Sequence, residues 1–198
     1  MEYERLKRQI QFIMEIDKLK HILRQTLLID GSRRENDAEH SWHIAVMAVL
    51  LSEYSSLKEI DVLRVIKLVL VHDLVEIDAG DVYCYDQGVN QDSVKQQEKN
   101  AAVRLFNLLP EDQAEEFFGL WEEFEKRITP EARFAASLDR LQPLLHDYNT
   151  KGVMWKRNHV KGEQVMVRNK VIADGSEILW EYAKGIIESS VENGFLQP

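Results

Sequence analysis

Apolar side chains recur every three or four positions over most of this chain, which is the spacing of one face of an α-helix. The nine Gly and four Pro residues fall mainly at breaks between these periodic stretches, so long helices between short breaks are expected. The pattern predicts helices over residues 3–29, 37–54, 57–77, 93–108, 110–126, 130–148 and 163–190, the last with a break near 174–175. We therefore expect one all-α domain, a helical bundle of about seven to nine helices over residues 1–198.

Two predicted helix starts carry a capping box, in which a side chain and a glutamate three residues later cap each other's backbone N–H. Asn36 with Glu39 precedes the helix from residue 37, and Ser56 with Glu59 precedes the helix from residue 57. The polar segments that we expect to be irregular are 82–93 and 149–162.

The most hydrophobic stretch of the chain, residues 65–71, leads directly into ionisable side chains. His72 and Asp73 follow it, then Glu76, and Asp81 comes after a glycine. The run alone resembles a buried strand, but helical spacing holds over four turns, and we predict a helix. Burying a carboxylate beside a neutral imidazole is costly unless a metal ion or an arginine pairs with it. The stretch therefore predicts part of a metal site or a buried ion pair.

Two further candidates lie on other predicted helices. His40, taken alone, reads as a capping or surface residue, and Asp139 as an ion-pair partner of Arg140. Together with His72 and Asp73 they make a set of two imidazoles and two carboxylates from three helices. Such a set suits Mn, Fe, Co, Ni, Zn or Mg better than a structural zinc site, which favours thiolates. Four protein ligands also leave coordination positions for water or a phosphate oxygen.

These residues resemble the pattern of the HD-domain metal-dependent phosphohydrolases. The stretches that resemble the branch containing bacterial 5'-deoxynucleotidases and their eukaryotic HD-domain relatives are 35–41 (ENDAEHS), 72–76 (HDLVE), 80–81 (GD) and 138–145 (LDRLQPLL). The resemblance covers about residues 15–185. It implies that His40, His72, Asp73 and Asp139 hold one divalent metal ion.

The resemblance also implies catalytic roles for two acids. Glu76 and Asp81 match an acidic pair that lies near the attacking water and the leaving oxygen. From the residues alone, Glu76 has a second interpretation as a hydrogen-bond partner of His72, and Asp81 as a helix cap.

An anionic substrate requires cationic side chains, and three arginines precede His40. Arg24, Arg33 and Arg34 are candidates for binding the substrate. In the nucleotidase branch an arginine upstream of the first histidine contacts phosphate, and Arg24 is the best positional match. A tryptophan follows that arginine in the branch and helps to reject ribose. Gln25 stands here instead, so the resemblance does not extend to a preference for deoxyribose.

Composition limits the partners. There are 25 Lys and Arg against 34 Asp and Glu, and a net charge of −9 argues against binding to nucleic acid or to an anionic membrane. Cys84, the single cysteine, excludes an internal disulfide and fits a reducing, cytoplasmic setting. The N-terminal stretch lacks the apolar core of a signal peptide, and no run approaches the roughly eighteen apolar residues of a membrane span.

The sequence thus predicts a metal-dependent phosphohydrolase that releases phosphate from nucleoside 5'-monophosphates. Two alternatives remain open: hydrolysis of another nucleotide, such as a triphosphate or a signalling nucleotide, and a regulatory module that binds nucleotide without turnover. A purely structural domain would use the same residues as buried ion pairs. The resemblance also implies a homodimer.

Overall fold

The computed structural model describes residues 2–86, 88 and 90–198. Its α-helices are α1 (Glu2–Ile16), α2 (Asp37–Leu51), α3 (Val62–Val71), α4 (Glu76–Ala79), α5 (Gln91–Phe106), α6 (Glu111–Lys126), α7 (Pro130–Asn149), α8 (Val153–Arg157), α9 (Gly162–Asn169), α10 (Ile172–Gly175) and α11 (Glu177–Glu192). Nine α-helices of the described chain have five or more residues, and the predicted all-α class is confirmed. The 3-10 helices are η1 (Asp17–His21), η2 (Ser52–Tyr54) and η3 (His72–Val75). No helix among the described residues is both long and apolar enough to span a bilayer.

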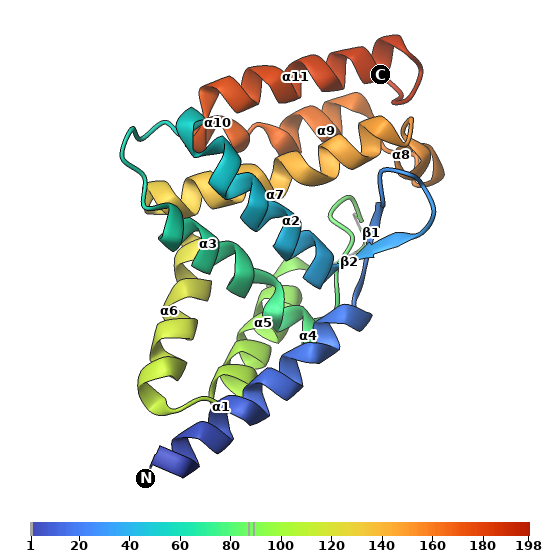
Figure 1. Cartoon of the computed structure of the whole chain (residues 1–198). Coiled ribbons are helices and arrows are strands. Elements are labelled where there is room, and N and C mark those ends of the chain that lie inside the picture. The colour runs from blue at the N-terminus through green and yellow to red at the C-terminus, as the bar shows by residue number, and fades with distance from the viewer. Residues whose placement is uncertain (1, 87, 89) are drawn as a thin grey trace.

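The longest helix, α7, runs through the middle of the molecule (Figure 1). It begins with Thr129, whose side chain accepts a hydrogen bond from the Ala132 backbone N–H, and with a proline in its first turn. It packs against α2, α3, α6, α10 and α11. Its buried apolar side chains include Phe134, Leu138 and Leu141, so the hydrophobic core surrounds this helix. Any polar side chain on its inner faces is therefore held inside the protein.

The N-terminal prediction was wrong beyond the first helix. Instead of one helix over 3–29, α1 ends at Ile16, and β1 (Leu23–Leu27) pairs antiparallel with β2 (Arg34–Asn36). Gly31 turns the chain between the strands at a φ of 72°, which a helix interior does not accommodate. The apolar spacing alone does not reveal the change, because the extended backbone is stabilised by a partner strand. The hairpin carries Arg24 toward the centre of the molecule.

The predicted helix 57–77 also differs. It begins at Val62, and Asp61 caps it by accepting a 3.0 Å hydrogen bond from the Arg64 backbone N–H. The expected Ser56–Glu59 capping box is therefore wrong, because a competing cap lies closer to the apolar run. At its far end the helix tightens into the 3-10 turn η3 before α4. By contrast, the capping box of Asn36 with Glu39 is confirmed at the start of α2.

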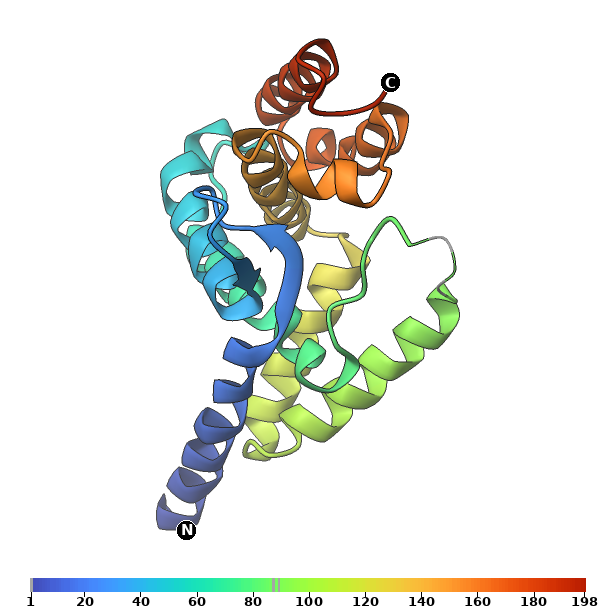
Figure 2. The same cartoon turned by 90° about the vertical axis from the view of Figure 1, so that its right-hand side faces the viewer.

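The C-terminal part encloses one side of the central helix. The segment 149–162, expected to be irregular, contains the short helix α8, and the predicted helix 163–190 is divided into α9, α10 and α11. The segment between α4 and α5 runs beside α8 and α9 (Figure 2), and side chains from both regions line one cavity. This segment includes Gln87 and Val89, which lie outside the described residues.

Candidate metal centre

The four expected metal ligands come together in the core. His40 lies in the first turn of α2, His72 and Asp73 in η3, and Asp139 in the middle of α7, and all four are buried. The Nε2 atom of His40 is 3.1 Å from Asp139 Oδ1 and 3.9 Å from Asp73 Oδ2. The Nε2 atom of His72 is 3.0 Å from Asp73 Oδ1 and 3.7 Å from Asp139 Oδ1. Two imidazole nitrogens and two carboxylates thus converge on one point.

Neighbouring carbonyl groups determine which imidazole nitrogens face this point as acceptors. His72 Nδ1 lies 2.8 Å from the Val69 carbonyl oxygen, and His40 Nδ1 lies 3.0 Å from Gln142 Oε1. Because a carbonyl oxygen only accepts, both Nδ1 atoms carry the proton and donate it. In neutral rings the lone pairs on the two Nε2 atoms would therefore point at carboxylate oxygens, and His72 Nε2 is buried without a hydrogen-bond partner. A cation between these atoms removes the repulsion.

The charges of the site also favour a cation. Burial opposes the protonation of His72, but the adjacent Asp73 and Asp139 carboxylates outweigh it and raise the pKa of His72 to about 10. Burial likewise works against ionisation of Asp73, yet His72 and Arg24 lower the pKa of Asp73 to about 2. Burial lowers the pKa of His40 to about 4. At neutral pH the metal-free site therefore holds ionised carboxylates, a neutral His40 and a protonated His72, so a bound metal ion would take the place of the His72 proton.

The donor set fits a divalent ion. Ligand atoms about 2.1 Å from an ion are about 3 Å apart when they are adjacent in its shell, and the distances between donors here begin at 3.0 Å. His40 and His72 each donate their other ring N–H to an oxygen, as metal-ligating histidines usually do. Imidazole and carboxylate ligands without thiolate match the first-row divalent metals expected from the sequence.

The two expected catalytic acids, Glu76 and Asp81, line a cavity of about 260 Å³. His72, Asp73 and Asp139 line it as well. Glu76 has a carboxylate oxygen within 4.8 Å of oxygens of Asp37 and Asp73, and its Oε2 is buried without a partner. Burial, then the charges of Asp73 and Asp37, raise the pKa of Glu76 well above its usual value. Asp81 follows Gly80, whose φ of 76° ends α4 and directs the chain back toward the cavity.

The three arginines differ in position. Arg24, on β1, donates from Nη1 to Asp73 Oδ2 at 2.9 Å and lies 3.3 Å from Asp37 Oδ1, so it belongs to the site. Arg33 instead pairs with the exposed side of Glu39 at 2.5 Å. Arg34 donates to the backbone carbonyl of Leu23 at 2.7 Å. Neither of these two lines the cavity, contrary to expectation, because Arg33 is exposed and Arg34 is bound to the backbone of β1.

Several residues of the site were missed in the sequence. Asp37 is fully buried beside Arg24, and Arg168 lines the cavity from α9. Arg140 donates to Asp139 Oδ2 at 2.7 Å while Asp139 Oδ1 faces His40. The ion-pair interpretation and the ligand interpretation of Asp139 are therefore compatible. The position of Arg140 directly after Asp139 could have placed Arg140 in the site. No comparable sequence feature marked Asp37 or Arg168 as site residues.

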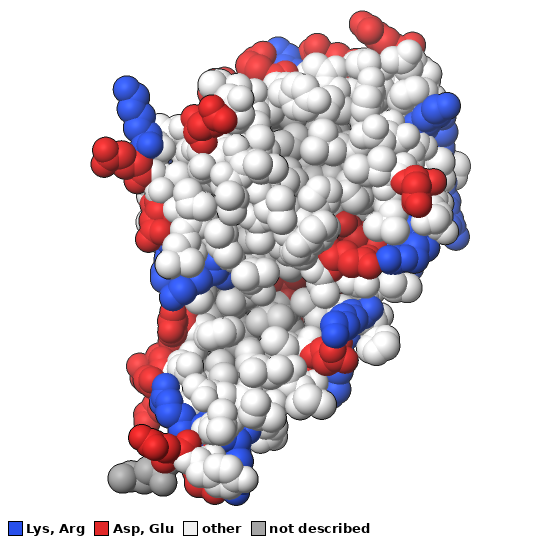
Figure 3. All heavy atoms as spheres, in the orientation of Figure 1, with Lys and Arg blue, Asp and Glu red and all other residues white. Residues whose placement is uncertain are grey.

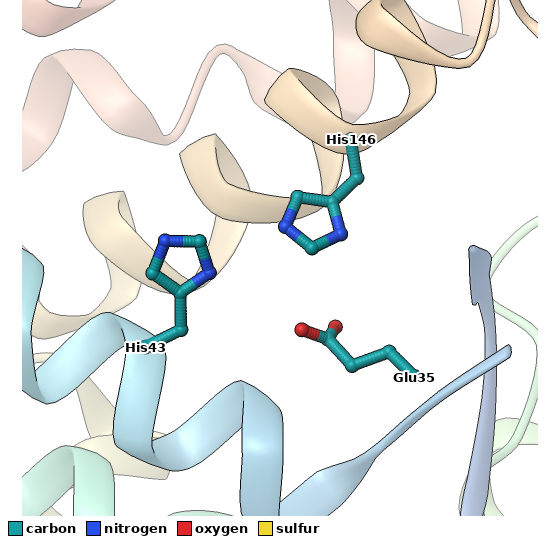
Figure 4. A group of neighbouring side chains, drawn as sticks. All are labelled: Glu35, His43 and His146. Atoms are coloured by element: carbon teal, nitrogen blue, oxygen red, sulfur yellow. The ribbon is translucent and has the colours of Figure 1, made fainter. Parts of the chain in front are cut away.

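A second group of ligating side chains lies behind His40. Glu35, His43 and His146 point toward one another (Figure 4), and each offers an atom within 4.8 Å of the others. The amide nitrogen of Gln142 lies among them, 2.7 Å from Glu35 Oε1 and 3.1 Å from His146 Nε2. Their centre is thus filled by an amide group.

Comparison with known proteins agrees with this geometry. A family model described as "HD domain" matches residues 16–180. The chain belongs to the HD-domain family. A crystal structure from Magnetospirillum magnetotacticum MS-1, described as a predicted metal-dependent phosphohydrolase, is 51% identical, with a TM-score of 0.94 over 98% of this chain and 96% of that one. Two HD-domain relatives named for an activity have lower sequence identity to this chain.

The 5'-deoxynucleotidase HDDC2 of Danio rerio is 32% identical over 142 residues, which are 70% of this chain and 68% of the relative. The human 5'-deoxynucleotidase HDDC2 is 31% identical over 69% of this chain and 65% of its own length. The match thus spans about two thirds of these relatives. A second solved structure, a conserved hypothetical protein from Pyrococcus furiosus, is 27% identical with a TM-score of 0.60.

Proposed function

We propose that this HD-domain protein is a divalent-metal-dependent phosphohydrolase that releases phosphate from nucleoside 5'-monophosphates. One observation carries the proposal: His40 Nε2 and His72 Nε2 converge with two ionised carboxylates at a cavity that Glu76 also lines. The 5'-deoxynucleotidase relatives support the substrate class.

One divalent ion would be held by His40, His72, Asp73 and Asp139. When bound, such an ion polarises a phosphate oxygen and lowers the pKa of a coordinated water. His72, Asp73 and Asp139 line the cavity, so a substrate in it would lie beside an ion held by these residues.

The side chains around the ion would bind the phosphate and move protons. Arg24 uses Nη1 for Asp73 and Asp37, which leaves Nη2 for a phosphate oxygen. Arg140 and Arg168 line the same cavity and add positive charge. Beside a bound cation Glu76 would be ionised despite its raised pKa and would take the proton of the attacking water, and Asp81, whose pKa burial also raises, would protonate the leaving ester oxygen. The ester bond between phosphorus and the 5' oxygen breaks, and the products are phosphate and a nucleoside.

A phosphate-release assay across nucleoside mono-, di- and triphosphates tests the proposal. Protein treated with a chelator should be inactive, and Mn²⁺ or Co²⁺ should restore hydrolysis of monophosphates. Asp73→Ala should lose metal binding and activity, while Asp92→Ala, an exposed carboxylate on α5, should retain both. Hydrolysis confined to triphosphates would overturn the substrate class. Nucleotide binding without turnover by the metal-loaded protein would indicate a regulatory module.

We also propose that a second copy of the chain covers the outer face of α2. Trp42 and Leu50 on this helix are 65% and 66% exposed, and Val46 and Val49 lie beside them on the same face. The surface over α2 and α3 carries few charged side chains (Figure 3). Large exposed apolar patches mark interfaces. Light scattering should give a dimer for the wild type and a monomer for Leu50→Glu, and a wild-type monomer would refute this assembly.

A further inference from the structure

His40 is held by a chain of hydrogen bonds whose direction is fixed. At the outer end, His146 Nδ1 lies 2.9 Å from the Leu27 backbone carbonyl, so Nδ1 carries the proton and donates it. The other nitrogen of the His146 ring is then an acceptor. It lies 3.1 Å from Gln142 Nε2, an amide nitrogen that donates. The Leu27 carbonyl thus determines which nitrogen of His146 carries the proton, and His146 in turn determines how the side-chain amide of Gln142 is oriented.

The amide passes this direction on to the metal centre. With Nε2 of Gln142 facing His146, Oε1 faces His40 Nδ1 at 3.0 Å and accepts its proton. A flipped amide would place Oε1 against the acceptor nitrogen of His146 and against Glu35 Oε1, which now receives a 2.7 Å hydrogen bond. Both contacts would become repulsive. The surrounding acceptors therefore permit only the orientation in which His40 keeps its proton on Nδ1.

Gln142 is well placed for this task. It is fully buried on α7, one turn beyond Asp139, so it cannot exchange these partners for water. Its Nε2 atom also lies 3.2 Å from His43 Nδ1, which gives the amide a third acceptor for two hydrogens. In Figure 4 Glu35, His43 and His146 surround the place that this amide fills.

We propose that Gln142 is a positioning residue that holds His40 in the Nδ1–H tautomer, so that the Nε2 lone pair is directed at the metal centre. The inference rests on the proposed metal site, but the tautomer is a property of the metal-free protein as well. Without the amide, the Nε2–H tautomer becomes competitive, because it donates to Asp139 at 3.1 Å. That tautomer cannot bind a metal ion through Nε2.

Nitrogen-15 NMR of the histidine rings and calorimetric titration with Co²⁺ test this role. Gln142→Met should shift the His40 ring toward the Nε2–H tautomer and weaken Co²⁺ binding by about 10- to 100-fold. The double variant Gln142→Glu/Glu35→Gln retains an acceptor facing Nδ1 and returns an amide donor to the contact between residues 35 and 142, so it should recover the tautomer. The control is Gln96→Met on the exposed surface of α5, which should change neither the His40 tautomer nor the affinity for Co²⁺.

The outcomes separate the two proposals. His146→Phe, which breaks the chain of hydrogen bonds one residue further from the metal centre than Gln142, keeps the test valid if Gln142→Met does not fold. An unchanged His40 tautomer in both variants would overturn the role of Gln142. Failure of the wild type to bind Co²⁺ would overturn the metal site alone, since the NMR comparison needs no metal ion.

A second inference comes from a different residue, Asp147, two turns after Asp139 on α7. It lines a cavity together with Arg24, Asp81 and Arg140, so this cavity adjoins the metal centre. One oxygen, Oδ1, is buried and has no hydrogen-bond partner. An unpaired buried acceptor is costly, and a donor on a bound ligand removes that cost. The aromatic side chains Tyr83 and Trp155 line the same cavity.

We infer that Asp147 binds the nucleoside part of the substrate, by accepting a hydrogen bond from a sugar hydroxyl or a base N–H group. This deepens the proposed function, on which it rests. The position fits, because a phosphate at Arg24 and Asp81 would leave its ester-linked group in the part of the cavity that Asp147 and Trp155 line.

Substrates with and without a donor test Asp147. Asp147→Ala should raise the KM for a nucleoside 5'-monophosphate by about 10-fold, the value of one hydrogen bond, and leave that for phenyl phosphate unchanged. Equal effects on both substrates would overturn the inference. If the wild type hydrolyses neither, the proposed function fails, and calorimetry with the free nucleoside decides about Asp147: binding weakened by the variant supports the role, and unchanged or absent binding refutes it.

Discussion

Arg24 Nη1 donates a 2.9 Å hydrogen bond to Oδ2 of Asp73, a residue 49 positions later in the chain. The guanidinium also lies 3.3 Å from Asp37 Oδ1. Arg24 therefore offsets the negative charge of the buried Asp37 and Asp73 carboxylates on the side of the site that faces the hairpin. One arginine thus connects the expected phosphate-binding function with the stability of the site.

Removing this arginine should affect both properties. Arg24→Met should raise the KM for a monophosphate by about 10- to 100-fold, because a charge-assisted hydrogen bond contributes about 1.5–3 kcal/mol. It should also lower the free energy of unfolding by about 3 kcal/mol without metal, since Asp37 and Asp73 remain buried without their partner. Thermal denaturation with and without Mn²⁺ measures the second effect, and Mn²⁺ should reduce it. An unchanged KM would contradict a role in phosphate binding.

Gln25 should govern how the enzyme treats the sugar. It follows Arg24 in the chain, at the place where the nucleotidase branch has a tryptophan. Its side chain lines the same cavity as Arg24 and Asp147. The wild type should therefore hydrolyse ribo- and deoxyribonucleoside monophosphates with similar kcat/KM. Gln25→Trp should shift the ratio by about 10-fold toward deoxyribonucleotides, because a methylene-sized clash is worth about 1–3 kcal/mol. Gln25→Leu controls for the loss of the amide, and a strong deoxyribose preference of the wild type would refute the prediction.

Asp147 makes stability depend on pH. Burial raises the pKa of Asp147 to about 7, against about 3.8 in the unfolded chain. Between these values the folded state binds more protons than the unfolded state, so the contribution of Asp147 to stability falls as pH rises from 4 to 7.

Asp147→Asn removes this dependence. The variant should be about 1–2 kcal/mol more stable than the wild type at pH 8, and the difference should vanish by pH 4. The full shift would correspond to about 4 kcal/mol, but the side chain is only partly buried, which reduces the effect. Urea unfolding at the two pH values measures it. A difference that does not change with pH would contradict the burial of an unpaired carboxylate.

The corrected start of α3 gives a test of the fold. Asp61→Ala should cost about 1 kcal/mol of stability, because it removes the cap of the Arg64 backbone N–H. Ser56→Ala should cost much less, since Ser56 is not the cap. Equal losses would favour the capping box that the sequence suggests.

The sequence by itself determined the helical class, most helix ranges and the order His40, His72–Asp73, Asp139. These features depend on local information: apolar spacing, caps and short motifs. The structure showed that the four side chains converge, with the His72 and Asp73 donor atoms 3.0 Å apart at a 3-10 turn where a continuous helix was predicted.

Only the tertiary structure decided where the hairpin lies and what surrounds the ligands. β1 continues the apolar spacing of a helix but is stabilised by pairing with β2, and that pairing keeps Arg33 away from the cavity that Arg24 reaches. Gln142 contacts His40 across 102 positions of sequence. Such contacts arise from the packing of helices around α7, and a periodic pattern records which face of a helix is buried but not which partner it meets.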